Sequence, residues 1–237
     1  NSWANLTPVL DCNVIGVKDF TTLAPGRVVS TVGAGSINGK ISLNTYLCVE
    51  NFTFLAGFGR TFFMQNGSVT FIDCDFVSSE SLANVELNSN NAGVTHTVMF
   101  IRCRSISAAN DGFSATILGA GEVIRWVEID CISQGSGRLG AGTHQGSSVH
   151  KAAGNGAVNV IRINGQYYDS YGPQNIADVG GTQSWNLGVS AHRTVHSTNC
   201  AFYLGDSGKM WLHSCKPNGL IDLQTDNAGG TIYTYDT

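Results

Sequence analysis

Short segments in which apolar and polar residues alternate recur along the chain. The clearest copies span Val69–Phe76, Val98–Ile106 and Trp126–Ile132, and each is rich in Val, Ile or Phe. A period of two is typical of a β-strand that buries one face. Gly, Asn and Ser clusters separate the copies, and no apolar run has helical spacing, so turns connect the strands. The pattern therefore predicts short strands without helices.

A cysteine marks the same place in most copies. Taking a poorer copy at Cys48 and a glycine substitute at Gly165, the anchors are separated by 26, 29, 28, 34 and 35 residues along the series Cys48, Cys74, Cys103, Cys131, Gly165 and Cys200. Such periods are typical of stacked coils, because one coil cannot bury its inner face alone. We predict an all-β fold, a right-handed parallel β-helix with coils of roughly 26–35 residues.

Two other folds compete with this prediction. A β-sandwich would use hairpin dipeptides such as Asn66-Gly67, which the chain contains, and a propeller would show longer repeats. The regular cysteine interval disfavours the sandwich. Within the helix interpretation, residues 1–45 form an N-terminal cap or incomplete coil, 46–215 the β-helix, and 216–237 a C-terminal end or cap.

The seven cysteines include no C-x-x-C pair, which disfavours a metal or redox site. Free cysteine behaves as a small buried hydrophobic residue, so we expect an internal ladder of reduced thiols. Unpaired thiols also indicate synthesis in a reducing cytoplasm, even for a protein that later works outside the cell. No metal and no cofactor are predicted, since the Gly-rich stretches do not precede a helix that could hold a phosphate.

Charge is sparse and slightly acidic. Charged residues make up 13% of the chain, the net charge is −4, and the 13 Lys and Arg are scattered singly. This arrangement disfavours nucleic acid as a partner. The apolar runs fall far short of the ~20 residues of a spanning helix, so no membrane insertion is expected. Because the chain opens at Asn1 without Met, we expect a processed or excised piece of a longer protein.

Three segments resemble the pectate-lyase-like superfamily of right-handed β-helices, to which bacteriophage tailspike depolymerases belong: Asn110-Asp-Gly-Phe-Ser114, Gly146-Ser-Ser-Val-His150 and Asn175-Ile-Ala-Asp-Val179. The resemblance implies a bacterial surface polysaccharide as partner, a homotrimer, and a place in a virion tail or outside the cell. It does not identify a reaction, because lyases, hydrolases, epimerases and structural spikes share the architecture. The chain lacks the acidic trio that holds calcium in pectate lyases, which disfavours calcium-assisted elimination.

Candidate catalytic residues follow the anchored strands of consecutive coils. Asp111, His150 and Asp178 would form a column, with the two carboxylates about 9 to 10 Å apart across one intervening coil. This lies near the ~6.5 to 9.5 Å of an inverting glycosidase, which favours a glycoside hydrolase over a lyase. In the competing interpretation both aspartates form turns and His150 is structural.

His144, Tyr171 and Trp185 are the candidate substrate-binding residues, because flat rings suit the apolar faces of sugars. Core packing is the alternative for the aromatic cluster that also contains Tyr167 and Tyr168. The first hypothesis is a spike that binds and cleaves polysaccharide. The second is a non-catalytic shaft or adhesin, which would not need the long, Gly- and His-bearing segment Gly137–Gly156. A monomeric epimerase or lyase would need a basic or Tyr partner that the sequence does not reveal.

Overall fold

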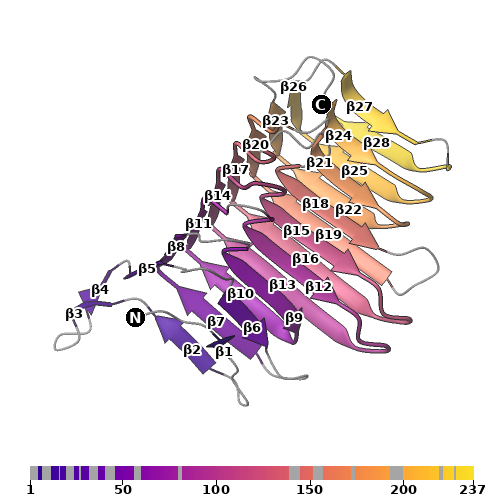
Figure 1. Cartoon of the computed structure of the whole chain (residues 1–237). Helices are drawn as coiled ribbons and strands as arrows, with labels where there is room; N and C mark the ends of the chain where they lie inside the picture. The colour runs from indigo at the N-terminus through magenta and orange to yellow at the C-terminus, as the bar shows by residue number, and fades with distance from the viewer. Residues whose placement is uncertain are drawn as a thin grey trace.

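The chain forms a solenoid of parallel strands. The computed structural model describes short stretches at 5–6, 12–15, 17–19, 24–26, 28–31 and 37–40, and then 46–55, 60–79, 82–138, 145–151, 157–171, 174–192, 200–218, 221–226 and 228–237. Within these residues there is no helix, and hence none that could span a membrane. Each turn of the solenoid adds one strand to each of three parallel sheets (Figure 1). The predicted parallel β-helix is confirmed.

The sheets are named here in chain order of their first strand. Sheet 1 contains β1 (Asn5–Leu6), β6 (Ile37–Lys40), β9 (Phe62–Asn66), β12 (Val85–Ser89), β15 (Phe113–Ile117), β18 (Ser147–Lys151), β21 (Gln174–Val179), β24 (Cys200–Leu204) and β27 (Ile221–Thr225). Sheet 2 contains β2 (Cys12–Ile15), β7 (Tyr46–Glu50), β10 (Ser68–Ile72), β13 (Thr95–Ile101), β16 (Val123–Ile129), β19 (Ala157–Ile163), β22 (Gln183–Leu187), β25 (Lys209–His213) and β28 (Thr231–Tyr235). Sheet 3 contains β5 (Val28–Thr31), β8 (Phe52–Leu55), β11 (Asp75–Val77), β14 (Arg104–Ile106), β17 (Ile132–Gln134), β20 (Gln166–Tyr168), β23 (Ser190–His192) and β26 (Lys216–Asn218).

The stack extends at both ends beyond residues 46–215. Strand β2 pairs with β7 in sheet 2, and β28 pairs with β25 at the other end. Strands β3 (Val17–Asp19) and β4 (Ala24–Pro25) form a separate antiparallel pair that lies beside the stack (Figure 1). Apart from β3 and β4, the described strands of the predicted terminal segments therefore continue the same three sheets.

A single left-handed residue turns the chain from sheet 2 into sheet 3. The φ angle lies between 49° and 62° in successive coils at Asn51, Asp73, Arg102, Asp130, Asn164, Gly188 and Ser214. Asn, Asp and Gly enter this region at low cost, which explains why short polar residues recur at this point of the repeat. Arg102 is the bulky exception, and its guanidinium donates two hydrogen bonds to Asp73 one coil earlier, at 2.8 and 2.7 Å.

The cysteine ladder follows this left-handed residue. Cys74, Cys103, Cys131 and Cys215 are buried, and each thiol donates a weak hydrogen bond to a carbonyl of the preceding coil. Gly165 occupies the same position, as predicted from the sequence. It must be glycine, because a Cβ there would lie 2.6 Å from the ring of Tyr167.

Two of the predicted anchors belong elsewhere. Cys48 pairs with Thr70 on sheet 2, four residues ahead of the ladder position, which is held by Phe52. Cys200 is buried on β24 of sheet 1. Turns of variable length caused this misalignment: Gln166, Ser190 and Lys216 are register partners, so the coils here are 24 and 26 residues long rather than 35.

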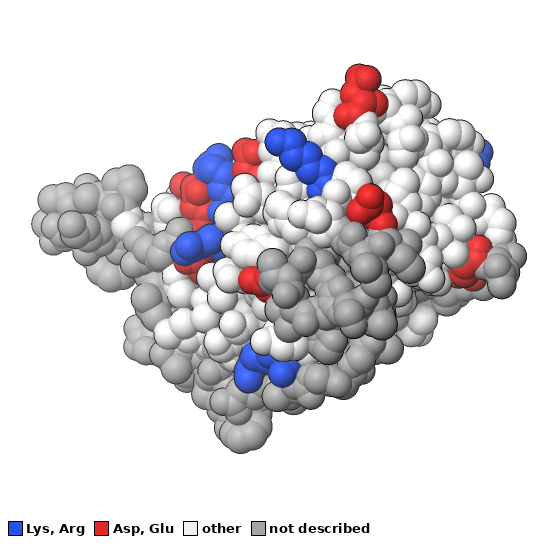
Figure 2. Space-filling model, turned by 90° about the horizontal axis from the view of Figure 1, so that it is seen from above, with Lys and Arg blue, Asp and Glu red and all other residues white. Residues whose placement is uncertain are grey.

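The interior changes in character along the axis. Aromatic rings fill the N-terminal half, where Phe71 stacks on Phe100 with centroids 5.5 Å apart, and Phe100 contacts Trp126 at 5.1 Å. Polar side chains replace them in the middle coils, where Phe100 is followed in register by Glu128 and then by Arg162. On the outside, acidic and basic residues occur in small groups between wide uncharged areas on the face shown in Figure 2.

We expect the buried thiols to resist labelling in the native protein. Burial raises the pKa of Cys200 to about 12 and also raises the pKa of Cys103 and Cys131, so little reactive thiolate forms at neutral pH. Alkylation followed by peptide mass spectrometry should modify Cys74, Cys103, Cys131, Cys200 and Cys215 only after denaturation. Rapid labelling of four or more cysteines without denaturant would contradict the ladder.

Candidate functional site

Asp178 lies inside the solenoid. It pairs in register with Val149, whose side chain faces the core, and it is 0% exposed. Its two carboxylate oxygens accept hydrogen bonds from Arg162 at 2.8 and 2.9 Å. Desolvation lowers the pKa of Arg162, but the charges of Asp178 and Glu128 outweigh it, so the pKa is raised and the guanidinium stays charged. The structure thus places Asp178 in a buried ion pair.

Glu128 carries the second buried carboxylate beside this pair. One of its oxygens accepts hydrogen bonds from the indole of Trp126 and the hydroxyl of Ser147, both at 2.6 Å. The other accepts one from the hydroxyl of Tyr167 at 2.7 Å. Buried charges persist only when paired and hydrogen-bonded, and both carboxylates meet that condition. These residues, with Arg162 and Asp178, are called the internal polar cluster below.

Asp111 and His150 occupy different surroundings. Asp111 is partly buried just before β15, and its carboxylate accepts a hydrogen bond at 2.8 Å from the backbone N–H of Gln145 in the next coil. His150 is exposed on β18, next to the inward-facing Val149. Successive strand residues point to opposite faces, so His150 faces outward and Asp178 inward. The three residues do not line one groove.

The predicted substrate-binding residues are also separated. His144 lies outside the described residues. Tyr171 lines a polar pocket of about 320 Å³ that also includes Arg138 and Asp169, whereas Trp185 lies on the outer face of sheet 2. Tyr167 is fully buried, so the core-packing alternative holds for this ring.

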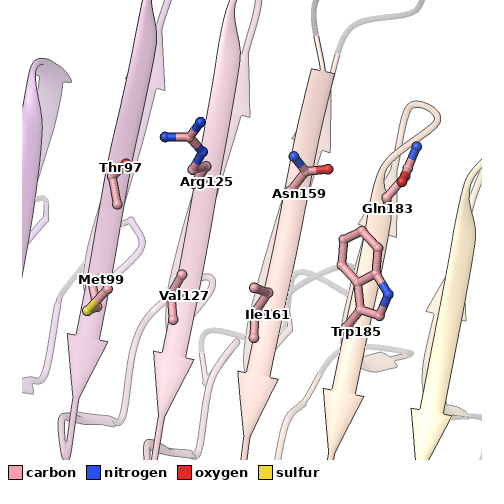
Figure 3. A pocket seen from close by; sticks show the side chains of 8 residues that line it. All are labelled: Thr97, Met99, Arg125, Val127, Asn159, Ile161, Gln183 and Trp185. Carbon is pink, nitrogen blue, oxygen red and sulfur yellow. The ribbon is translucent and has the colours of Figure 1, made fainter.

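A hollow of about 560 Å³ lies on the outer face of sheet 2 and is called the sheet 2 groove. Four neighbouring strands line it with Thr97, Met99, Arg125, Val127, Asn159, Ile161, Gln183 and Trp185. Figure 3 shows two rows, one polar and one apolar. The strand register explains them, because Thr97, Arg125, Asn159 and Gln183 are successive partners, and so are Met99, Val127, Ile161 and Trp185.

A change in side-chain size produces the hollow. Beyond the groove the apolar row continues with large rings, and Trp185 stacks on Trp211 with centroids 4.9 Å apart and planes 6° apart. On its other side Trp185 has Ile161 as register partner, and Val127 follows. The aliphatic side chains project less far from the sheet than an indole does. One wall of the groove is therefore a tryptophan, and its floor is aliphatic. The groove is amphipathic, with hydrogen-bonding groups along one side.

The eight lining residues include no carboxylate. The acidic residues of β16 and of the turn before it, Glu128 and Glu122, are both fully buried. Among the described residues no three His, Cys, Asp or Glu side chains gather in a way that could hold a metal ion. The groove is therefore equipped for binding through stacking and neutral or cationic hydrogen-bond donors.

Sequence reasoning identified Trp185 and missed the rest of this groove. The alternation of apolar and polar residues along the strands could have identified the other groove residues. Arg125 and Val127 flank the inward-facing Trp126, and the same parity places Asn159 and Ile161 outward on the next strand. The candidate motifs with ionisable residues lie instead on or beside strands β15, β18 and β21 of sheet 1. Comparison with protein-family models, with curated proteins and with solved structures gave no match.

We predict that Asp178→Asn destabilises the fold. The change removes one charge of a buried ion pair and leaves Arg162 without its bidentate partner, which costs about 3–5 kcal/mol in other proteins. Asp111→Asn is the matched control: its amide oxygen can still accept the Gln145 N–H, so we expect a change within about 0.5 kcal/mol. Urea denaturation followed by circular dichroism measures both. Equal stability of the Asp178 variant and the unaltered protein would contradict the structural role.

Proposed function

We propose that this protein binds a polysaccharide along the sheet 2 groove. The observation that carries the proposal is the amphipathic form of the groove, in which a tryptophan wall and an aliphatic floor run beside a row of hydrogen-bonding side chains. A sugar ring has a matching pair of surfaces, with C–H groups on its faces and hydroxyls around its edge. Ring stacking and hydrogen bonds can therefore act on it together.

The size and direction of the groove support this ligand. Its volume of about 560 Å³ lies in the usual range for small-molecule sites. It crosses four strands, each about 4.8 Å from the next, so it runs along the solenoid axis for roughly 14 Å. An extended glycan chain fits such a path. The resemblance to tailspike depolymerases points to the same class of ligand.

The proposal covers binding and leaves cleavage as a separate prediction. An inverting hydrolase needs two carboxylates on opposite sides of one glycosidic bond. Asp178 is engaged with Arg162 in the interior, and Asp111 holds the backbone of Gln145. Hydrolysis by this pair, the homotrimer and the virion location all stay predictions. The non-catalytic shaft remains the competing function.

The test is loss of glycan binding in a groove variant. In a screen of immobilised bacterial surface polysaccharides, Trp185→Ala should weaken binding at least tenfold, because the substitution removes the stacking wall. Tyr168→Ala is the control, since Tyr168 is a half-buried aromatic residue on sheet 3. It should leave affinity unchanged.

Two results would count against the proposal. Equal affinity of the Trp185 variant for a glycan that the protein binds would move the site away from the sheet 2 groove. Absence of binding to any polysaccharide in the screen would favour the shaft.

A further inference from the structure

Arg125 differs from other arginines of the described surface. The guanidinium groups of three others pair with carboxylates at 2.5 to 2.7 Å, in the pairs Arg60–Glu86, Arg102–Asp73 and Arg104–Asp75. Arg125 is exposed in the sheet 2 groove and, within the described part of the chain, makes neither an ion pair nor a hydrogen bond through its side chain. It presents a guanidinium with unused N–H donors to a ligand in the groove.

The surroundings of Arg125 leave its charge uncompensated. It is the one charged residue among the eight that line the groove. Its register partners on either side are Thr97 and Asn159, both neutral. On the same strand, Glu128 points into the core and is 0% exposed. In a chain of net charge −4, the groove therefore has a local positive charge.

We infer that the polysaccharide bound in the sheet 2 groove is acidic, and that Arg125 binds a carboxylate group of one of its sugar units. This inference rests on the proposed function and specifies its ligand. A guanidinium matches a carboxylate through two parallel N–H···O hydrogen bonds, and this pairing is stronger than a hydrogen bond between neutral groups. Asn159 and Gln183 continue the same row and can bind hydroxyls of adjacent units.

The spacing of the two principal groups sets a minimum ligand length. Arg125 lies on β16 and Trp185 on β22, two strands further along sheet 2. Two strand steps correspond to about 10 Å along the axis, which exceeds the reach of one sugar ring. The unit bound by Arg125 and the unit stacked on Trp185 are therefore different units of one chain.

The experiment compares each acidic polysaccharide with its own neutral form. Uronic-acid-containing bacterial capsular polysaccharides are immobilised beside their carboxyl-reduced counterparts, and affinities are measured by surface plasmon resonance. The unaltered protein should bind an acidic form at least tenfold more tightly than its reduced form. Arg125→Gln should weaken binding of the acidic form more than binding of the reduced form, so that the difference between the two affinities is lost. Added salt should weaken binding of the acidic form in the unaltered protein more than in the variant.

A charge-matched control separates the local effect from net charge. Lys216→Gln removes one positive charge from an exposed residue of sheet 3, and it should not alter either affinity. If Arg125→Gln binds the acidic form as tightly as the unaltered protein, or if acidic and reduced forms bind equally, the inference is overturned. Binding that still depends on Trp185 would in that case uphold the proposed function. Failure to bind any glycan would overturn both.

Discussion

The fold depends on in-register pairing of parallel strands from one coil to the next. In sheet 2, Val69, Val98, Trp126 and Val160 are successive partners across coils of 29, 28 and 34 residues, although the turns between them differ in length. Because side chains alternate between faces, a shift of one residue would exchange the interior with the surface. The left-handed residue that follows each sheet 2 strand from β7 to β25 maintains the register by starting sheet 3 at a constant position.

The same alternation places the two opposite charges of β16 on opposite faces of sheet 2, and on β19 it places a cation inside and a neutral amide outside. On β16, Glu128 points inward and Arg125 outward, and on β19, Arg162 points inward and Asn159 outward. The acidic groups that could have neutralised the groove are thus held inside, where Arg162 pairs with Asp178. The internal polar cluster is weak evidence for added stability, since the cost of desolvating its charges offsets most of their attraction. Its position nevertheless leaves the outer face with an uncompensated cation.

The shape of the groove also follows from the register of the strands. Each outward row of sheet 2 repeats one position of the coil, so a ligand that runs along the axis meets a series of equivalent side chains. Trp185 marks the point where the apolar row changes from stacked rings to aliphatic residues, and the hollow lies on the aliphatic side. Binding on this face requires no change in the core, because the backbone of sheet 2 lies between the groove and the core. Substitutions that alter ligand choice are therefore separable from substitutions that alter stability.

The sequence alone determined the architecture, because strands, turns and the repeat each depend on local patterns of residues. Alternation of apolar and polar residues defined the strands, Gly, Asn and Ser clusters defined the turns, and the ladder from Cys74 through Cys131 to Gly165 gave the period. Tertiary structure alone decided which ionisable residues reach solvent. The sequence placed Asp178 beside His150 in one column, but the parity of β18 and β21 puts the two side chains on opposite faces. Parity depends on register, register depends on the length of each turn, and turn length is the feature that a repeat of variable period leaves undetermined.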